Sequence, residues 1–187
     1  VEALRGDLTA KFPNVKFGFD YNNGANIVTM PKEYVFLAFK HLKDTGRFDF
    51  LMMVSGVDYP NREKRFDVVY ELFSTRTFER ARFKVQVGED EDVPTLIHLW
   101  RGADWLERET WDMFGIKFAG HPNLRRLLCH HEFVGYPLRK DYPADGQQHC
   151  RTSLPVYFDV DPPYKEDPDK DLTPLNFGPS HPATHGT

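Results

Sequence analysis

Proline is distributed very unevenly along this sequence. Ten of its 14 prolines lie after Gly120, where no apolar run keeps a helical or strand period beyond a few residues. Proline fixes the backbone φ angle and has no amide hydrogen, so it interrupts both helices and sheets. The sequence therefore predicts a regularly folded region over residues 1–118 and a long, extended, proline-rich tail from residue 119 onward.

The beginning of the chain shows helical and strand patterns in turn. Leucine and phenylalanine recur at helical spacing over residues 1–12, which predicts a short amphipathic helix. Two strands are expected at 15–19 and 25–30, because the Asn-Gly pair between them readily forms a tight hairpin turn. A second helix is expected over 32–43, since a proline precedes it and Gly46 supplies a stop.

Three longer β segments follow at 48–57, 65–74 and 78–87, and the short turns between them predict an antiparallel meander. The third segment alternates in polarity, so its residues divide between two faces of a sheet. The apolar face carries Ala81, Phe83, Val85 and Val87, and the polar face carries Arg80, Arg82, Lys84 and Gln86. One face of the sheet is therefore expected to be buried and the other to be exposed to solvent.

A last helical pattern runs over residues 94–114 and ends before Gly115. The residues of its apolar stripe are Leu99, Ala103, Leu106 and Met113. Together these patterns predict an α/β fold of the α+β type, in which helices pack on one face of a mostly antiparallel sheet. The extended proline-rich tail follows this domain.

The tail contains many large apolar side chains although it has no regular period. They are Phe133, Tyr136, Leu138, Tyr142, Tyr157, Phe158 and Phe177. An irregular segment cannot cover such side chains by itself, so another surface has to cover them. The sequence therefore predicts that the tail lies against a partner protein.

Composition excludes several classes of function. The net charge of −4 and the pI near 6.1 supply no basic field for nucleic acid or an anionic membrane surface. No apolar run approaches the ~18 residues of a membrane-spanning helix, so we expect any membrane role to act through partners. The chain has two cysteines and no Cys-x-x-Cys pair, which indicates a reducing compartment and no iron–sulfur ligation. No glycine-rich phosphate loop is present.

Two groups of residues could carry chemistry, and each also has a simpler interpretation. A metal could bind Cys129, His130, His131, His149 and Cys150, but their spacing is not that of a standard zinc site. We therefore interpret them as ordinary polar residues and predict no metal. Glu109 and Asp112 could serve as an acid–base pair of a free-standing hydrolase, although a partner-facing helix edge explains them better.

Two basic pairs in the tail, Arg125 with Arg126 and Arg139 with Lys140, suit a partner that bears carboxylates, because guanidinium groups bind carboxylates bidentately. At the end of the chain, His181 and His185 place two imidazoles four residues apart, and neutral imidazole can donate a hydrogen bond to a carbonyl oxygen. From the residues alone, this end is interpreted as a frayed terminus.

Residues 105–118, Trp-Leu-Glu-Arg-Glu-Thr-Trp-Asp-Met-Phe-Gly-Ile-Lys-Phe, closely resemble the signature of the C subunits, of the 30 kDa type, of respiratory complex I. Residues 120–128, Gly-His-Pro-Asn-Leu-Arg-Arg-Leu-Leu, and 135–143, Gly-Tyr-Pro-Leu-Arg-Lys-Asp-Tyr-Pro, are similar to the rest of that signature. Upstream segments at 48–51, 57–60 and 65–70 also resemble the family. The resemblance covers most of residues 30–143.

This resemblance implies a structural subunit of the peripheral arm of NADH:quinone oxidoreductase, with residues 1–118 as its domain and 119–173 as a tail docked on the D subunit. It implies no cofactor on this chain and no catalysis by it, while the complex uses NADH, FMN, iron–sulfur clusters and quinone for ion translocation. Other peripheral-arm subunits would be neighbours, on the cytoplasmic side of the membrane. The expected docking residues are Glu107, Arg108, Glu109, Asp112, Arg125, Arg126, Arg139, Lys140 and Asp141.

Residues 174–187 resemble the start of the D subunit, which implies a fusion of C and D. In that family the second histidine of this motif lies at the quinone headgroup, so His185 is the expected quinone ligand and His181 lies close by. The alternative within the same superfamily is the equivalent subunit of a membrane-bound hydrogenase complex. Paired Cys-x-x-Cys nickel ligands in the rest of a D region would distinguish the two.

Overall fold

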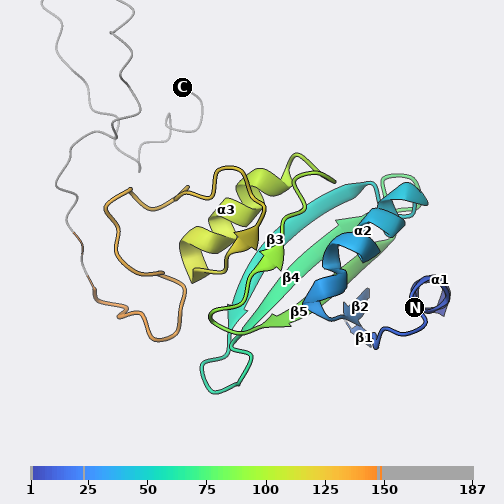
Figure 1. Ribbon diagram of the computed structural model, residues 1–187, viewed down its shortest axis with the longest axis horizontal. Helices are drawn as coiled ribbons and strands as arrows, with labels where there is room; N and C mark the ends of the chain where they lie inside the picture. Colours follow the sequence, from blue (N-terminus) through green and yellow to red (C-terminus); the bar gives the residue numbers. More distant parts are fainter. Residues whose placement is uncertain (1, 23, 147, 149–187) are drawn as a thin grey trace, which may run out of the picture. The chain divides into compact units, whose positions relative to one another are not determined.

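The computed structural model describes residues 2–22, 24–146 and 148, which fall within one compact unit spanning residues 1–153 (Figure 1). The elements in chain order are α1 (Glu2–Lys11), β1 (Gly18–Asn22), β2 (Ala25–Thr29), the 3-10 turn η1 (Lys32–Tyr34), α2 (Val35–Asp44), β3 (Phe50–Asp58), β4 (Phe66–Phe73), β5 (Arg80–Val87), β6 (Val93–Pro94), α3 (Ala103–Phe114) and β7 (Phe118–Ala119). No helix among these residues has the length and apolar character needed to cross a bilayer.

The main sheet has five strands in the order β1-β2-β5-β4-β3. Strands β3, β4 and β5 pair antiparallel in succession, so the predicted meander is confirmed. Strands β1 and β2 form the predicted hairpin, and β2 then pairs parallel with β5. The sheet is therefore mostly antiparallel, and the predicted fold class is confirmed.

Helix α2 covers one face of this sheet (Figure 1). Its apolar stripe of Val35, Ala38, Phe39 and Leu42 is buried. The Phe39 ring meets Tyr70 on β4 edge-on at a centroid distance of 5.1 Å and Phe83 on β5 at 4.9 Å. Burying one such aromatic side chain stabilises the fold by about 2–3 kcal/mol, so this contact ties the helix firmly to the sheet.

Helix α3 lies beside β3 at the end of the sheet (Figure 1). The Thr110 hydroxyl donates a hydrogen bond to the Val54 carbonyl at 3.0 Å. Gly56 allows the close approach, because a Cβ atom there would lie 2.7 Å from the Phe114 ring. The helix thus occupies the edge of β3 that has no neighbouring strand in the main sheet.

The opposite face of the sheet carries Arg80, Arg82, Lys84 and Gln86 of β5, as the alternation predicts. The apolar partners Ala81, Phe83, Val85 and Val87 are all fully buried on the α2 side. None of the described helices packs on the polar face. The prediction of one buried and one wet face is therefore confirmed.

Two predicted boundaries are wrong in ways that have physical causes. The first strand was expected at 15–19 but lies at 18–22, because the two-residue turn places Asn22 directly opposite Ala25. The last helix was expected from residue 94 but begins at Ala103. Residues 96–103 instead form successive tight turns, with the Leu99 and Trp100 amides both bonded to the Leu96 carbonyl.

Candidate functional site

The candidate site is the junction between α3 and the irregular segment at residues 120–146 that follows β7. Helix α3 ends at Gly115, whose φ of +79° suits the left-handed conformation that glycine adopts without strain. A Cβ atom at this position would lie 2.5 Å from the Tyr136 ring and 2.6 Å from the Arg139 guanidinium. The 120–146 segment therefore returns to pack directly on the end of the helix.

The carboxylate of Asp112 holds the first part of this segment. It has no solvent exposure and accepts hydrogen bonds from the amides of Leu127, Leu128 and Cys129 at 2.9, 2.7 and 2.9 Å. The Arg126 guanidinium donates a fourth bond at 2.7 Å. Burial acts to raise the pKa of Asp112, but these four donors outweigh it and keep the pKa below its usual value.

Two arginines complete this junction. Arg108 on α3 is buried and donates to the carbonyls of Arg125 and Arg126, both at 3.2 Å. Arg126 also donates to the Gly135 carbonyl at 2.9 Å. Its guanidinium lies 5.3–5.7 Å from the ring centroids of Phe133, Tyr136 and Trp111, distances at which cation–π attraction operates.

Arg139 fixes the later part of the segment to the domain. Its Nε donates to the Phe114 carbonyl at 2.6 Å, and its Nη1 pairs with Glu89. The guanidinium also lies 4.6 Å from the Tyr136 ring centroid and 5.1 Å from that of Phe66. The neighbouring Leu138 amide donates to the Met113 carbonyl at 3.1 Å, so backbone and side chain hold the same turn.

A third attachment joins the 120–146 segment to Asp58 at the end of β3 and to Arg65 directly before β4. Asp58 accepts two bonds from Arg65, at 2.8 and 2.9 Å, and one from the Lys140 amide at 2.7 Å. Arg65 also pairs with Asp141 at 2.8 Å. Bonding to the Arg65 guanidinium is the main cause that lowers the pKa of both Asp58 and Asp141, while their charges raise the pKa of Arg65.

Glu107 lies on α3 with no exposure and contacts the turn before the helix. Its carboxyl accepts bonds from the Thr95 hydroxyl at 2.5 Å and the Leu96 amide at 2.6 Å. Burial raises the pKa of Glu107 to about 7 against these two donors, and the charge of Asp104 adds to the effect. The nearby Tyr70 hydroxyl is buried without a partner among the described residues.

The outer side of this junction exposes several large apolar side chains. Trp105 on α3 is 63% exposed, and Leu128, Val134 and Leu138 in the 120–146 segment are 63%, 74% and 52% exposed. Apolar side chains that are exposed on a segment held in place by buried bonds are typical of an interaction surface. In contrast, Phe133, Tyr136 and Tyr142 are partly buried against the rest of the described chain.

The structure brings most of the predicted docking residues together at this junction. Glu107, Arg108 and Asp112 are buried, and Arg126, Arg139 and Asp141 form bonds within the chain. The residues whose side chains are exposed are Glu109, Arg125, Lys140 and Asp141. A docking role for the nine residues stays a prediction, and the buried ones can support it only by holding the segment in place.

The other predicted sites are placed as follows. Glu109 is exposed whereas Asp112 is buried, so the proposed acid–base pair does not share one environment. Among the described residues no three His, Cys, Asp or Glu side chains gather as metal ligands, and Cys129 is a free thiol. His149 and Cys150 lie outside the described residues. His181 and His185 also lie outside them, so the quinone role stays a prediction.

Sequence reasoning missed Asp58 and Arg65 as part of the site. One signal was available, because Asp58 occupies a position of β3 at which the alternation calls for a buried residue opposite Phe66. A carboxylate at a buried position requires a charged or hydrogen-bonding partner. That requirement would have directed attention to the basic residues that follow it, among them Arg65 directly before β4.

Comparisons with known proteins agree with the motif resemblance. Residues 28–148 match the family described as "Respiratory-chain NADH dehydrogenase, 30 Kd subunit". The fused C/D subunit of the NADH-quinone oxidoreductase of Bdellovibrio bacteriovorus is 52% identical over 188 residues, covering all of this chain and 34% of that protein. The C subunit of the same enzyme from Sinorhizobium medicae is 46% identical over 148 residues, covering 78% of this chain and 70% of that protein. This chain thus spans about a third of the length of the fused relative.

A solved structure shares the fold at low sequence identity. It is a chain from the structure of the membrane-bound sulfane sulfur reductase, an archaeal respiratory membrane complex. That chain superposes with a TM-score of 0.65 at 21% identity, covering 91% of this chain and 98% of its own length. At this identity the likeness concerns the fold alone.

Proposed function

The chain belongs to the family of 30 kDa subunits of respiratory-chain NADH dehydrogenases, and we propose that it is a structural subunit of the peripheral arm of an NADH:quinone oxidoreductase. Residues 1–118 form the scaffold domain, and residues 119–173 dock on a D-type partner. The complex carries electrons from NADH through FMN and iron–sulfur clusters to quinone, on the cytoplasmic side of the membrane. This chain supports that transfer without a catalytic group of its own.

The single observation that supports docking is the set of exposed apolar side chains on the fixed segment. The Leu128 amide is the middle one of the three that donate to Asp112, and Leu138 directly precedes Arg139. The backbone that carries their exposed side chains is therefore held in place before any partner binds. Preorganised apolar groups of this kind lose little conformational entropy on binding, which favours a stable interface.

Residues 174–187 extend the proposal to quinone. Because the chain aligns over its whole length with a fused C/D relative, we infer that these residues begin a D-type region. His185 would donate a hydrogen bond from its imidazole to a quinone carbonyl, and His181 would support the same loop. The rest of a D-type region would supply the remainder of that site.

The docking proposal is tested by capturing a separately expressed, tagged D-type region with the chain. Leu138→Asp places a charge in the proposed interface and should weaken capture at least tenfold, because a fully desolvated carboxylate without a partner is costly. Leu37→Asp on α2 is the matched control, since Leu37 is 51% exposed and Leu138 is 52% exposed. Equal capture by the two variants would contradict the docking role.

A further inference from the structure

The polar face of the main sheet carries a second surface, separate from the 120–146 segment. Five basic side chains lie along it, which we call the basic row: Lys16, Lys64, Lys84, Arg82 and Arg80. We propose that the basic row docks an acidic, extended segment of a partner protein. This proposal does not depend on the tail docking on a D-type partner.

Strand β5 sets the direction of the row. Arg80, Arg82, Lys84 and Gln86 alternate with buried residues and therefore share the face that no described helix covers. Arg82 lies opposite Glu71 and Ile27, and Lys84 lies opposite Val69 and Thr29. At about 3.3 Å per residue the row extends roughly 20 Å, the length of an extended segment of about six or seven residues.

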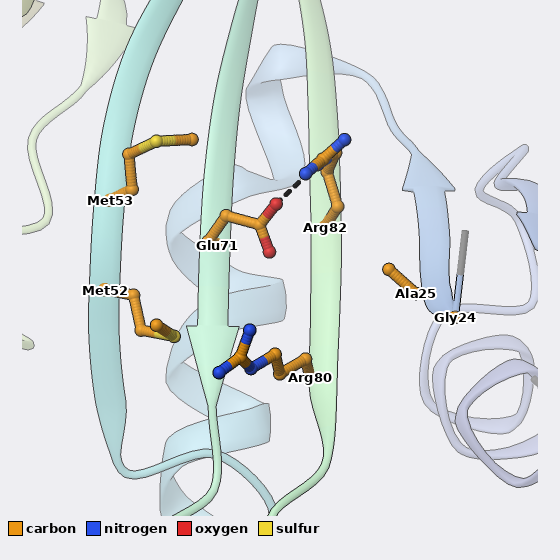
Figure 2. Close-up of a pocket in the computed structure, with 7 residues that line it drawn as sticks. All are labelled: Gly24, Ala25, Met52, Met53, Glu71, Arg80 and Arg82. Atoms are coloured by element: carbon orange, nitrogen blue, oxygen red, sulfur yellow. Dashed lines mark hydrogen bonds and ion pairs between the residues drawn. The ribbon is translucent and has the colours of Figure 1, made fainter. Parts of the chain in front are cut away.

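One end of the row opens into a hollow of about 420 Å³. Figure 2 shows Arg82 bonded to Glu71, whereas the Arg80 guanidinium extends across β4 toward Met52. Among the described residues Arg80 lies 5.6 Å from the Phe73 ring centroid and forms no ion pair. The side chains of Met52, Met53 and Ala25 form the apolar wall of this hollow. The hollow thus offers an unpaired cation beside flexible methionines, which suit irregular contacts.

The other end of the row opens into a second hollow of about 320 Å³, lined in part by Lys16, Lys64, Thr29 and Gln86. Lys64 is 3.8 Å from Glu91, but that carboxylate is already bonded to Lys32 at 2.9 Å. Lys16 has no carboxylate partner among the described residues. Lys84, between the two hollows, also has none there. The surface therefore presents at least three positive charges without an ion-pair partner among the described residues. Glu71 and the exposed Asp20 of β1, which is in register with Ile27 and Arg82, are carboxylates near them in the sheet register.

The charge pattern favours a protein segment over nucleic acid or lipid. The whole chain carries a net charge of −4, so a large polyanion would meet repulsion outside the row. A short extended segment touches only the row, and its alternate side chains repeat at the same spacing as those of β5. Carboxylates at alternate positions would therefore meet Arg80, Arg82 and Lys84 in succession.

The test uses the chain and a labelled peptide of about nine residues in which glutamate and serine alternate. A second peptide with glutamine in place of glutamate is the uncharged comparison. At low salt we expect the glutamate peptide to bind about tenfold more tightly, which is what three exposed ion pairs provide together. The double variant Arg80→Glu/Lys84→Glu should remove that preference, whereas Lys11→Glu/Lys117→Glu, with the same change of charge elsewhere, should retain most of it.

Circular dichroism checks that each variant is folded. If the double variant Arg80→Glu/Lys84→Glu unfolds, Arg80→Gln/Lys84→Gln takes its place. Equal binding of the two peptides, or a preference that survives in the double variant, would overturn the proposal. Tighter binding of phosphatidylglycerol vesicles or of a short RNA than of the glutamate peptide, lost in the same variant, would also overturn it. Neither result would affect capture of a D-type region, which depends on Leu138.

Discussion

Replacement of Glu107 by glutamine isolates the effect of one buried ionisable group on stability. The pKa of Glu107 is raised to about 7 from a reference value of 4.5. The folded state therefore binds a proton between pH 4.5 and about 7 that the unfolded state has released. By linkage, stability falls as pH rises through this window, and the stabilising contribution of the protonated form is lost above pH 7.

The magnitude follows from the size of the shift. A raise from 4.5 to about 7, at about 1.4 kcal/mol per pH unit, corresponds to roughly 3 kcal/mol between the two ends of the window. Glutamine has nearly the shape of the protonated carboxyl and keeps an oxygen for the Leu96 amide. Glu107→Gln should therefore be within about 1 kcal/mol of the unchanged chain at pH 5 and exceed its free energy of unfolding by up to about 3 kcal/mol at pH 8.

Urea unfolding followed by circular dichroism, in steps from pH 5 to pH 8, measures this difference. The two proteins share every other ionisable group, so the contributions of those groups cancel in the difference. Glu109→Gln is the control, because Glu109 is an exposed carboxylate two residues along the same helix. A Glu107→Gln difference that stays constant from pH 5 to pH 8 would refute the reasoning.

Three further variants test the junction itself. Asp112→Ala leaves three backbone amides and the Arg126 guanidinium without their acceptor, so unfolding in urea should show a loss of about 3–5 kcal/mol; a loss below about 1 kcal/mol would count against the buried network. Gly115→Ala forces a side chain into a left-handed position 2.5 Å from the Tyr136 ring, and should cost about 2 kcal/mol or more in thermal unfolding, whereas Gly102→Ala, in open space, should not. Arg139→Met removes the bond to the Phe114 carbonyl and should speed protease cleavage within residues 120–146. The far-ultraviolet circular dichroism of the domain should be unchanged. Unaltered cleavage would show that other contacts hold the segment.

The meander could be predicted because its pairing is local. Strand β3 pairs with β4, and β4 pairs with β5, so each pairing joins strands that follow one another along the chain, and alternation and turn residues were enough. The parallel pairing of β2 with β5 could not be read in the same way, because the partners are far apart in sequence and α2, β3 and β4 lie between them. Their pairing depends on contacts between segments far apart in the sequence, among them the packing of α2 on the sheet.

The start of α3 shows a second limit of pattern reading. Leu99 and Ala103 fit a helical stripe, yet the turns before the helix bury apolar residues at a similar spacing. The segment before the helix is held in another conformation, because Val93 and Pro94 pair with β7 and the Leu96 amide bonds to the Glu107 carboxylate. These partners lie eleven or more residues away along the chain, so a local pattern does not reveal them.

The charged residues of the signature were predicted from the sequence, but their surroundings were not. A carboxylate such as Asp112 is equally suited to a partner's arginine and to Arg126 of its own chain, because the bonding chemistry is the same. Only the path of the 120–146 segment decides between these possibilities. The junction residues were therefore found by motif, while their internal bonds emerged from the three-dimensional structure.

The hairpin of β1 and β2 has a consequence for the behaviour of shortened chains. Strand β5 has β4 on one side and only β2 on the other, and the Met30 amide bonds to the Lys84 carbonyl beyond the end of β2. A polypeptide beginning near residue 31 would leave the amides and carbonyls on that side of β5 open to water. An unprotected strand of this kind recruits the same strand from other molecules. Such a truncation should therefore aggregate even though α2, α3 and the meander of β3, β4 and β5 are complete.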